Sequence, residues 1–178
     1  PEQRKVAKTI NFGVVYGQTA YGLSQTLGVS PSEAKDFIER YFKRYSQVKY
    51  YLQGLVEKAR EQGFALTEWG RRRFLPEINS SNRMRREMAE RAAINTPIQG
   101  TAADMIKAAM IKISSEIKKQ KLTTRMILQV HDELVFEVPN HEKEAIQGLV
   151  ISEMESAMKL SVPLKVDTAW GKSWRECS

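Results

Sequence analysis

The sequence predicts an α+β fold in which a helical portion is followed by helices packed on a small antiparallel sheet. Two patterns indicate this class. Hydrophobic residues recur at helical spacing through most of the first 120 residues, whereas residues 126–138 form two apolar, β-branched runs that meet at a polar centre. The chain has 178 residues, of which 42% are hydrophobic, so it can bury a core in one or two small domains and is not a disordered polymer.

Proline and glycine positions predict the N-terminal elements. Pro1 suits the first helical position, and Gly13 and Gly17 each raise the free energy of a helix by about 1 kcal/mol, so the first helix is expected to loosen there as a hinge. Residues 30–33, Ser-Pro-Ser-Glu, form a capping box. They predict the start of one long helix that places its tyrosines in the core and stops at Gly63.

The central elements are a short hairpin and two helices. Residues 64–67 and 72–75 are predicted strands, so that a run of arginines lies on the hairpin arm. Residues 81–95 and 98–119 again show a helical period, and Pro97 between them is expected to break the run.

The C-terminal elements are the hairpin over residues 126–138, then a helix and a strand. Asn140 is expected to cap a helix that ends near Leu160, and residues 162–166 alternate as a last strand. No apolar run approaches the roughly 18 residues that span a bilayer, so we expect no membrane as partner.

The charge pattern favours a polyanion. The formal net charge is +7 and the isoelectric point is near 9.5. Residues 71–91 contain three carboxylates and the arginines Arg71, Arg72, Arg73, Arg83, Arg85, Arg86 and Arg91. A solvated helix face accounts for such a run; with the motifs described below, we favour a contact with a nucleic-acid backbone. The single cysteine, Cys177, excludes an intrachain disulfide and a thiolate zinc cluster, as in a reducing cytoplasm.

Near the N-terminus, every fourth residue carries a cation or a ring. Arg4, Lys8, Phe12 and Tyr16 therefore form one stripe on a helix. Like charges four residues apart cost about 0.2 to 0.5 kcal/mol, and cations near a helix N-terminus oppose its dipole. A bound phosphate removes both costs. The stripe predicts a phosphorylated, ring-bearing ligand, although a basic surface helix with two core rings has the same pattern.

The predicted hairpin presents polar residues at its turn. These are His131, Asp132 and Glu133, and acidic residues at a tight reversal suit a hard divalent cation. A metal-dependent phosphohydrolase is one reading of this turn. Such enzymes need further histidines or carboxylates on helices, and the only other histidine in the sequence is His141.

These motifs resemble those of family A DNA polymerases. Residues 4–17, which read Arg-x3-Lys-x3-Phe-x3-Tyr-Gly, are similar to motif B, and residues 130–133, Val-His-Asp-Glu, to motif C. Residues 91–104 resemble the family's third recognisable stretch. The three occur in the family's order and spacing. The resemblance, strongest to bacterial members, covers essentially the whole chain.

The resemblance implies roles on the nucleotide side. Arg4 and Lys8 match residues that hold the triphosphate of the incoming deoxynucleoside triphosphate, and the lysine can protonate the leaving pyrophosphate. Phe12 matches a residue that stacks near the nucleotide sugar and base. Tyr16 matches one that occupies the template-base position until the fingers close.

It also implies roles in catalysis and DNA binding. Asp132 matches a catalytic carboxylate that ligates two magnesium ions, Glu133 a supporting neighbour, and His131 a residue near the primer terminus. The resemblance and the charge pattern together assign four further residues to DNA: Arg73, Arg91, Asn95 and Gln99. Minor-groove acceptors look alike for every correct base pair, so donors there can test pairing without reading sequence.

By resemblance, residues 1–85 are a fingers portion and residues 86–178 a palm portion. Motif A, with the second metal-binding aspartate, and the thumb are not found in the chain. We therefore expect a fragment that is inactive alone and acts on primer–template DNA with the remainder of the polymerase chain, in the bacterial cytoplasm with the nucleoid. The alternative is a non-catalytic DNA-binding module, which predicts salt-sensitive DNA binding with no response to nucleotide.

Overall fold

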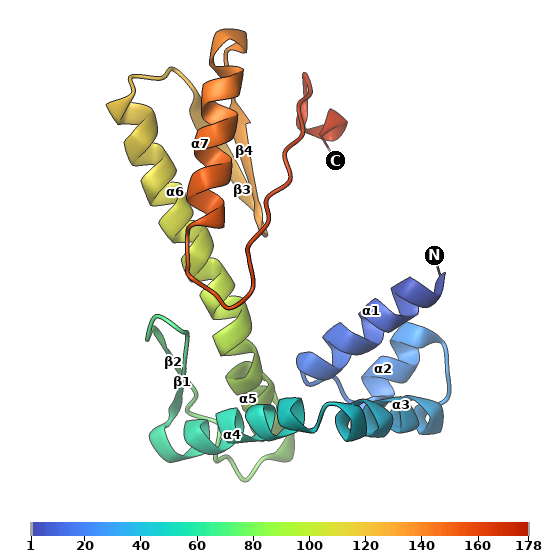
Figure 1. Ribbon diagram of the computed structural model, residues 1–178. Coiled ribbons are helices and arrows are strands. Elements are labelled where there is room, and N and C mark those ends of the chain that lie inside the picture. The colour runs from blue at the N-terminus through green and yellow to red at the C-terminus, as the bar shows by residue number, and fades with distance from the viewer. Residues whose placement is uncertain (1, 178) are drawn as a thin grey trace. The chain divides into compact units, whose positions relative to one another are not determined.

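The computed structural model describes residues 2–177, without the side chains of residues 2, 3 and 5 (Figure 1). The chain divides into two compact units, Pro1–Gly100 and Thr101–Ser178. Each combines helices with a two-stranded antiparallel sheet, which confirms the α+β class. The predicted role of Pro1 lies outside the described residues. The predicted boundary between the fingers and palm portions, at residues 85 and 86, differs from the boundary between these units, at residues 100 and 101. The functional division into fingers and palm stays a prediction.

In its described part, the first unit consists of helices, one hairpin and a π-helical turn. Its elements are α1 (Glu2–Val15), α2 (Ala20–Leu27), α3 (Pro31–Arg44), α4 (Ser46–Gln62), β1 (Phe64–Leu66), β2 (Arg72–Phe74), α5 (Arg83–Asn95) and η1 (Thr96–Gly100). Helices α1, α2 and α3 pack on one another, while α4 packs against α5 and β1 (Figure 1). Small side chains allow the close packing of α4, the hairpin and α5, whose shared core is Ala59, Ala65, Leu75, Ile78, Ala89 and Ala93.

The capping box at the start of α3 is confirmed, but the single long helix is wrong. Ser30 Oγ accepts the Glu33 N–H at 3.2 Å, and the Glu33 carboxylate accepts the Ser30 N–H at 2.9 Å. The helix ends at Tyr45, whose φ of −117° and ψ of 59° are not helical, and α4 starts at the next residue. The apolar spacing continues through this break without a glycine or proline, so the sequence period does not reveal it. Gly63, with a φ of 79°, ends α4 as predicted.

Three tyrosines around this break are exposed, contrary to the prediction that they lie in the core, and Tyr41 is half-buried. Tyr45, Tyr50 and Tyr51 expose 51%, 66% and 52% of their surface. Helix α4 buries Leu52 and Ala59, a narrow stripe that leaves rings at other positions in solvent.

Pro97 lies inside the π-helical turn η1 and does not end the helical run, so the predicted break is wrong. Helix α5 runs directly into η1. In an α-helix proline removes a hydrogen bond, and its ring clashes with the carbonyl four residues earlier; a π-helical turn widens the helix and relieves that clash. The Thr96 hydroxyl donates to the Ala92 carbonyl at 2.6 Å and supports the turn.

The second unit packs two helices on the predicted hairpin. Its elements are α6 (Thr101–Lys119), β3 (Arg125–Val130), β4 (Glu133–Glu137), η2 (Asn140–Glu142), α7 (Lys143–Glu155) and η3 (Trp174–Glu176). The core between α6 and α7 consists of Ala109, Ile113, Ile117, Ile146 and Val150. Met126, Leu134 and Phe136 of the hairpin pack against that core, so one face of the sheet is buried and the hairpin is confirmed.

Two C-terminal predictions are wrong. Asn140 does not cap the last helix; it begins the 3-10 turn η2 after Pro139, and α7 ends at Glu155, before Leu160. Residues 162–166 form no strand in the described structure, because a strand needs a partner ladder and the returning chain bonds to a helix instead. The Val166 N–H donates to the Glu155 carboxylate at 3.2 Å.

Candidate functional site

The stripe predicted on α1 lines a cavity of about 550 Å³ in the first unit. The lining residues come from α1, α2, the turn between them and α5: Lys8, Thr9, Phe12, Gly13, Tyr16, Gln18, Thr26 and Arg91. Cavities of about 300 to 1,000 Å³ are the usual size for small-molecule and cofactor sites. Three of the four stripe residues therefore share a space large enough for a nucleotide-sized ligand. Arg4 is exposed and does not line this cavity.

Helical spacing explains how the stripe residues meet. The rings of Phe12 and Tyr16 stack with centroids 5.9 Å apart and an interplanar angle of 14°. Lys8 Nζ lies 5.7 Å from the centroid of the Phe12 ring. A cation thus stands one turn before two parallel rings, the arrangement expected for a ligand with both phosphate and aromatic groups.

A Schellman motif ends α1 directly beside this cavity. Gly17 has a φ of 70°, its N–H donates to the Val14 carbonyl at 3.1 Å, and the Gln18 N–H donates to the Gly13 carbonyl at 2.8 Å. A Cβ on Gly17 would lie 3.4 Å from Ile94 and 3.6 Å from Arg91. The turn therefore rests on α5, which brings Arg91 into the wall of the α1 cavity.

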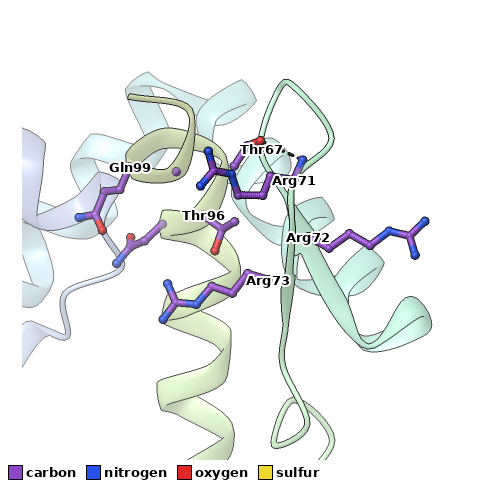
Figure 2. Close-up of a pocket in the computed structure, with 8 residues that line it drawn as sticks. Thr67, Arg71, Arg72, Arg73, Thr96 and Gln99 are labelled. Carbon is purple, nitrogen blue, oxygen red and sulfur yellow. Dashed lines mark hydrogen bonds between the residues drawn. The ribbon is translucent and has the colours of Figure 1, made fainter. Parts of the chain in front are cut away.

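A second, smaller cavity of about 150 Å³ lies between the hairpin and η1. It is lined by Thr67, Arg71, Arg72, Arg73, Asn95, Thr96, Gln99 and Gly100. Figure 2 shows the side chains of Arg71 and Arg73 pointing toward the helical side that carries Thr96 and Gln99, and Arg72 pointing away. The Arg72 guanidinium lies 4.8 Å from the centroid of the Phe64 ring. Three residues assigned to DNA by the sequence, Arg73, Asn95 and Gln99, therefore share one cavity.

Close packing holds the hairpin against η1 at this cavity. A Cβ on Gly100 would lie 2.6 Å from Thr67 Cγ2, so glycine is required for the approach. Thr67 Oγ1 accepts the Arg71 N–H at 3.2 Å (Figure 2). Asn95 Oδ1 is buried and has no hydrogen-bond partner within the described residues. A buried unpaired acceptor is costly, and in the wall of a cavity it suits a donor brought by a ligand.

The arginine run separates into two groups. Arg83 donates to the Glu87 carboxylate at 2.7 Å, and this hydrogen bond is the main reason that the pKa of Glu87 is lowered. The other charge pairs of this surface are Arg85 with Glu77 at 3.7 Å, Arg86 with Glu90 at 3.9 Å, and Arg60 with Glu90 at 2.6 Å. A solvated, internally paired helix face thus describes the start of α5. The predicted nucleic-acid contact remains a hypothesis for the arginines that line the two cavities, which are Arg71, Arg72, Arg73 and Arg91.

In the second unit, His131 and Asp132 form the two-residue turn between β3 and β4. Val130 pairs with Glu133 across the turn, and His131 adopts a φ of 52°. All three of the predicted residues His131, Asp132 and Glu133 are exposed. Within the described residues, no cluster of three or more histidine, cysteine, aspartate or glutamate side chains could hold a metal ion. The three residues at and beside the turn therefore do not form a complete metal site by themselves.

The opposite end of this hairpin is fixed by a buried carboxylate. One oxygen of Glu142 accepts the N–H and hydroxyl of Thr123, both at 2.8 Å, and the other accepts those of Thr124 at 2.9 and 2.6 Å. These bonds, led by the Thr123 N–H, lower the pKa of Glu142 to about 2. Thr124 immediately precedes β3, so Glu142 anchors the base of the hairpin that presents Asp132.

Sequence patterns alone did not single out Thr67, Gln18 or Thr26. Thr67 and Thr26 are isolated hydroxyl residues with no periodic signal. Gln18 follows a Tyr-Gly pair, and the helix-stop role of that glycine is the one signal that points to it.

Comparisons with known proteins are consistent with this geometry. The family model for DNA polymerase family A matches residues 1–176. The chain belongs to DNA polymerase family A. It is 52% identical over 174 residues to DNA polymerase I of Mycobacterium leprae, covering 98% of this chain and 19% of that protein. It is 49% identical over 174 residues to DNA polymerase I of Bacillus caldotenax, covering 98% of this chain and 20% of that protein.

A solved structure has the same fold as this chain over nearly its whole length. The POL domain of Pol1 from M. smegmatis, in complex with DNA primer-template and dNTP, is 49% identical with a TM-score of 0.94. The match covers 99% of this chain and 31% of that chain. The chain therefore spans about a fifth of the length of the curated relatives that it matches. Among the described helices, none has both the length and the apolar character that crossing a bilayer requires.

Proposed function

We propose that this chain forms the motif B to motif C part of a template-directed DNA polymerase. The complete enzyme adds deoxynucleotides to a primer 3′ end by two-metal phosphoryl transfer in the bacterial cytoplasm, with the nucleoid. The observation that carries the proposal is the α1 cavity, where Lys8, Phe12, Tyr16 and Arg91 meet. A cation followed by stacked rings suits a nucleoside triphosphate, because phosphoryl transfer depends mostly on positioning and charge neutralisation.

On the nucleotide side, the side chains take separate tasks. Lys8 binds the triphosphate and donates a proton from Nζ to the leaving pyrophosphate. Arg4, one turn before Lys8 on α1, adds positive charge where the phosphates approach. The Phe12 ring packs against the nucleotide sugar and base, and Tyr16 occupies the template-base position before the fingers close. A ring face accepts any base, as copying all four requires.

On the DNA side, residues that line the cavity beside η1 contact the duplex. Arg73 neutralises backbone phosphates, and Asn95 and Gln99 contact minor-groove acceptors, which are shared by all correct pairs. Arg91, which lies on α5 and lines the α1 cavity, contacts the template backbone. His131 approaches the primer terminus from the motif C hairpin.

Asp132 is the proposed metal ligand of this chain. Its carboxylate offers hard oxygen donors on an exposed turn, which fits Mg²⁺, and Glu133 supports the same turn. The second carboxylate is proposed to come from motif A of the remaining polymerase chain. When bound, two magnesium ions supply charge neutralisation at the attacking and leaving oxygens. Asp132 presents its carboxylate from the exposed turn between β3 and β4.

Primer extension by the intact polymerase and by residues 1–178 alone tests the proposal. With primer–template, all four deoxynucleotides and magnesium, the intact enzyme should extend the primer and the isolated chain should not. Processive synthesis by the isolated chain would refute the need for motif A. If the intact protein instead binds DNA in a salt-sensitive way and never responds to nucleotide, it is the DNA-binding module considered above.

A further inference from the structure

The side chain of Gln18 fills a slot between two glycines beside the nucleotide cavity. A Cβ on Gly13 of α1 would lie 2.5 Å from Gln18 Oε1, and a Cβ on Gly22 of α2 would lie 3.1 Å from Gln18 Cγ. Both distances are shorter than ordinary contacts. A side chain at either glycine would therefore force the glutamine to shift from its present position.

A directed hydrogen-bond chain holds the end of that side chain. Gln18 Nε2 donates to Thr26 Oγ1 at 3.1 Å, and the Thr26 hydroxyl donates to the Gly22 carbonyl at 3.0 Å. The Gln18 backbone N–H meanwhile donates to the Gly13 carbonyl in the Schellman motif. One residue thus links the last turn of α1 to the interior of α2 through both its backbone and its amide.

Three members of this arrangement, Gly13, Gln18 and Thr26, line the cavity together with Phe12 and Tyr16. Phe12 lies on the last turn of α1 and Tyr16 directly follows that helix, so the positions of the two rings depend on what holds this end of α1. Gln18 contacts α2 through Gly22, whereas Gly17 contacts α5, so these are two separate contacts of the same turn.

We infer that Gln18 is a positioning residue of the nucleotide site, which holds Phe12 and Tyr16 in place by pinning the end of α1 to Thr26 of α2. The inference rests on the proposed function. When Phe12 and Tyr16 are already held in place, nucleotide binding does not pay the entropy cost of ordering them. Loss of the Gln18–Thr26 hydrogen bond, called the pin below, should therefore weaken nucleotide binding more than it slows the chemical step.

Three single variants of the intact polymerase remove the pin in different ways. Gln18→Ala deletes the amide, Thr26→Val deletes its acceptor with little change of shape, and Gly13→Ala pushes away Oε1, the movable end of the glutamine. Each should raise the KM for deoxynucleotide about two- to tenfold, the value of one hydrogen bond, with kcat nearly unchanged. Thr26→Ser keeps the hydroxyl and should keep the wild-type KM. Gln25→Ala, at an exposed position of α2, is the matched control.

The double variant Gly13→Ala/Gln18→Ala provides the decisive comparison. If the alanine acts by displacing Gln18, the double variant should have the KM of either single variant, because the pin is lost only once. KM changes that multiply would overturn the inference. So would an unchanged KM with a lower melting temperature and less active enzyme, the result of a merely structural role.

Failure of the proposed function gives a different result. In that case the wild-type protein itself does not extend primers, whatever the state of Gln18. The link between Gln18 and Thr26 is then tested by the melting temperatures of the wild type, Gly13→Ala, Gln18→Ala and the double variant. Non-additive decreases in melting temperature support the link, and additive decreases overturn it.

Discussion

The two compact units present their predicted site residues in opposite ways. In the first, a stripe on α1 meets groups from α2 and α5 around a cavity of about 550 Å³. In the second, Asp132 lies on an exposed two-residue turn, and no metal-binding cluster surrounds it within the described residues. The proposed nucleotide site is therefore formed inside one unit, whereas the proposed metal ligand Asp132 requires further donors from the rest of the polymerase chain. Substitutions in the two units should consequently differ in size and in kind.

The largest effect is expected at the turn of the second unit. In the intact polymerase, Asp132→Ala should reduce turnover on the order of a thousandfold or more, because the lost carboxylate acts on charge that develops in the transition state. Binding of primer–template DNA should stay nearly unchanged. Single-turnover primer extension and DNA titration measure the two quantities.

Glu133→Ala is the matched control, at the next residue, which is the first of β4 and is also exposed. Its effect should be clearly smaller, because Glu133 is assigned a supporting role. Equal residual activity in the two variants would contradict the assignment of Asp132 as the metal ligand, and would break the contrast between the units.

Within the first unit, we expect substitutions of the two cations on α1 to differ in their effect on nucleotide use. Lys8 lines the cavity and lies beside the Phe12 ring, whereas Arg4 is exposed outside it. Lys8→Ala should weaken nucleotide use by about 10- to 100-fold, as expected for a charge-assisted contact, and Arg4→Ala by less. DNA affinity should barely move. A large loss of DNA binding with unchanged nucleotide dependence would favour the plain DNA-binding module.

Local patterns predicted a good part of this arrangement. The four-residue spacing placed Lys8, Phe12 and Tyr16 on one helix face, and the two apolar runs located the hairpin with Asp132 at its turn. These features depend on neighbours within a few residues in sequence, so the periodicities of helix and strand are sufficient to predict them.

Features that depend on tertiary contacts were not predictable in this way. Arg91 reaches the α1 cavity because Gly17 rests on α5, more than seventy residues further along the chain. Pro97 was expected to end a helix, since a local rule cannot foresee that a π-helical turn accommodates it. The break at Tyr45 leaves the apolar spacing intact, so it too has no local signal.

A smaller effect is expected where the hairpin meets η1. Gly100→Ala places a Cβ about 2.6 Å from Thr67 Cγ2 and should separate the hairpin from η1. Overpacking of this kind costs roughly 1 to 3 kcal/mol of stability, and DNA affinity should fall about two- to tenfold as Arg73 moves away from Gln99. Thermal melting and DNA titration of the intact polymerase measure both.

Two further variants show whether that contact is the cause. Gly54→Ala lies in α4, where a Cβ meets nothing within 4 Å, and should be neutral or slightly stabilising. Adding Thr67→Ser to Gly100→Ala removes the clashing methyl group and keeps the hydroxyl that accepts the Arg71 N–H. The added serine should restore DNA affinity. If affinity stays low, the hairpin is not held through this contact.

The smallest effect is expected at the buried end of the second unit, where Glu142 accepts four hydrogen bonds. Folding lowers the pKa of this carboxyl from its ordinary 4.5 to about 2, so its contribution to stability is complete above the ordinary pKa and is lost as the pH falls toward 2. Glu142→Gln should abolish this pH dependence, because an amide does not titrate in this range. It should also lower the stability at every pH, because the amide keeps one acceptor oxygen and turns a donor toward the threonines.

The protection of the Thr123 and Thr124 amides against hydrogen exchange reports this anchor locally. In the wild-type polymerase, protection should be constant from pH 7 to about 5 and fall below that, whereas in Glu142→Gln it should be lower throughout and vary little with pH. Glu144→Gln, on the exposed first turn of α7, should behave as wild type. Because the anchor lies at the opposite end of the hairpin from Asp132, turnover should change little even where protection is lost. A loss of turnover that follows the loss of protection would mean that the exposed turn depends on the buried base, and the second unit would then hold its carboxylate as firmly as the first holds its cavity.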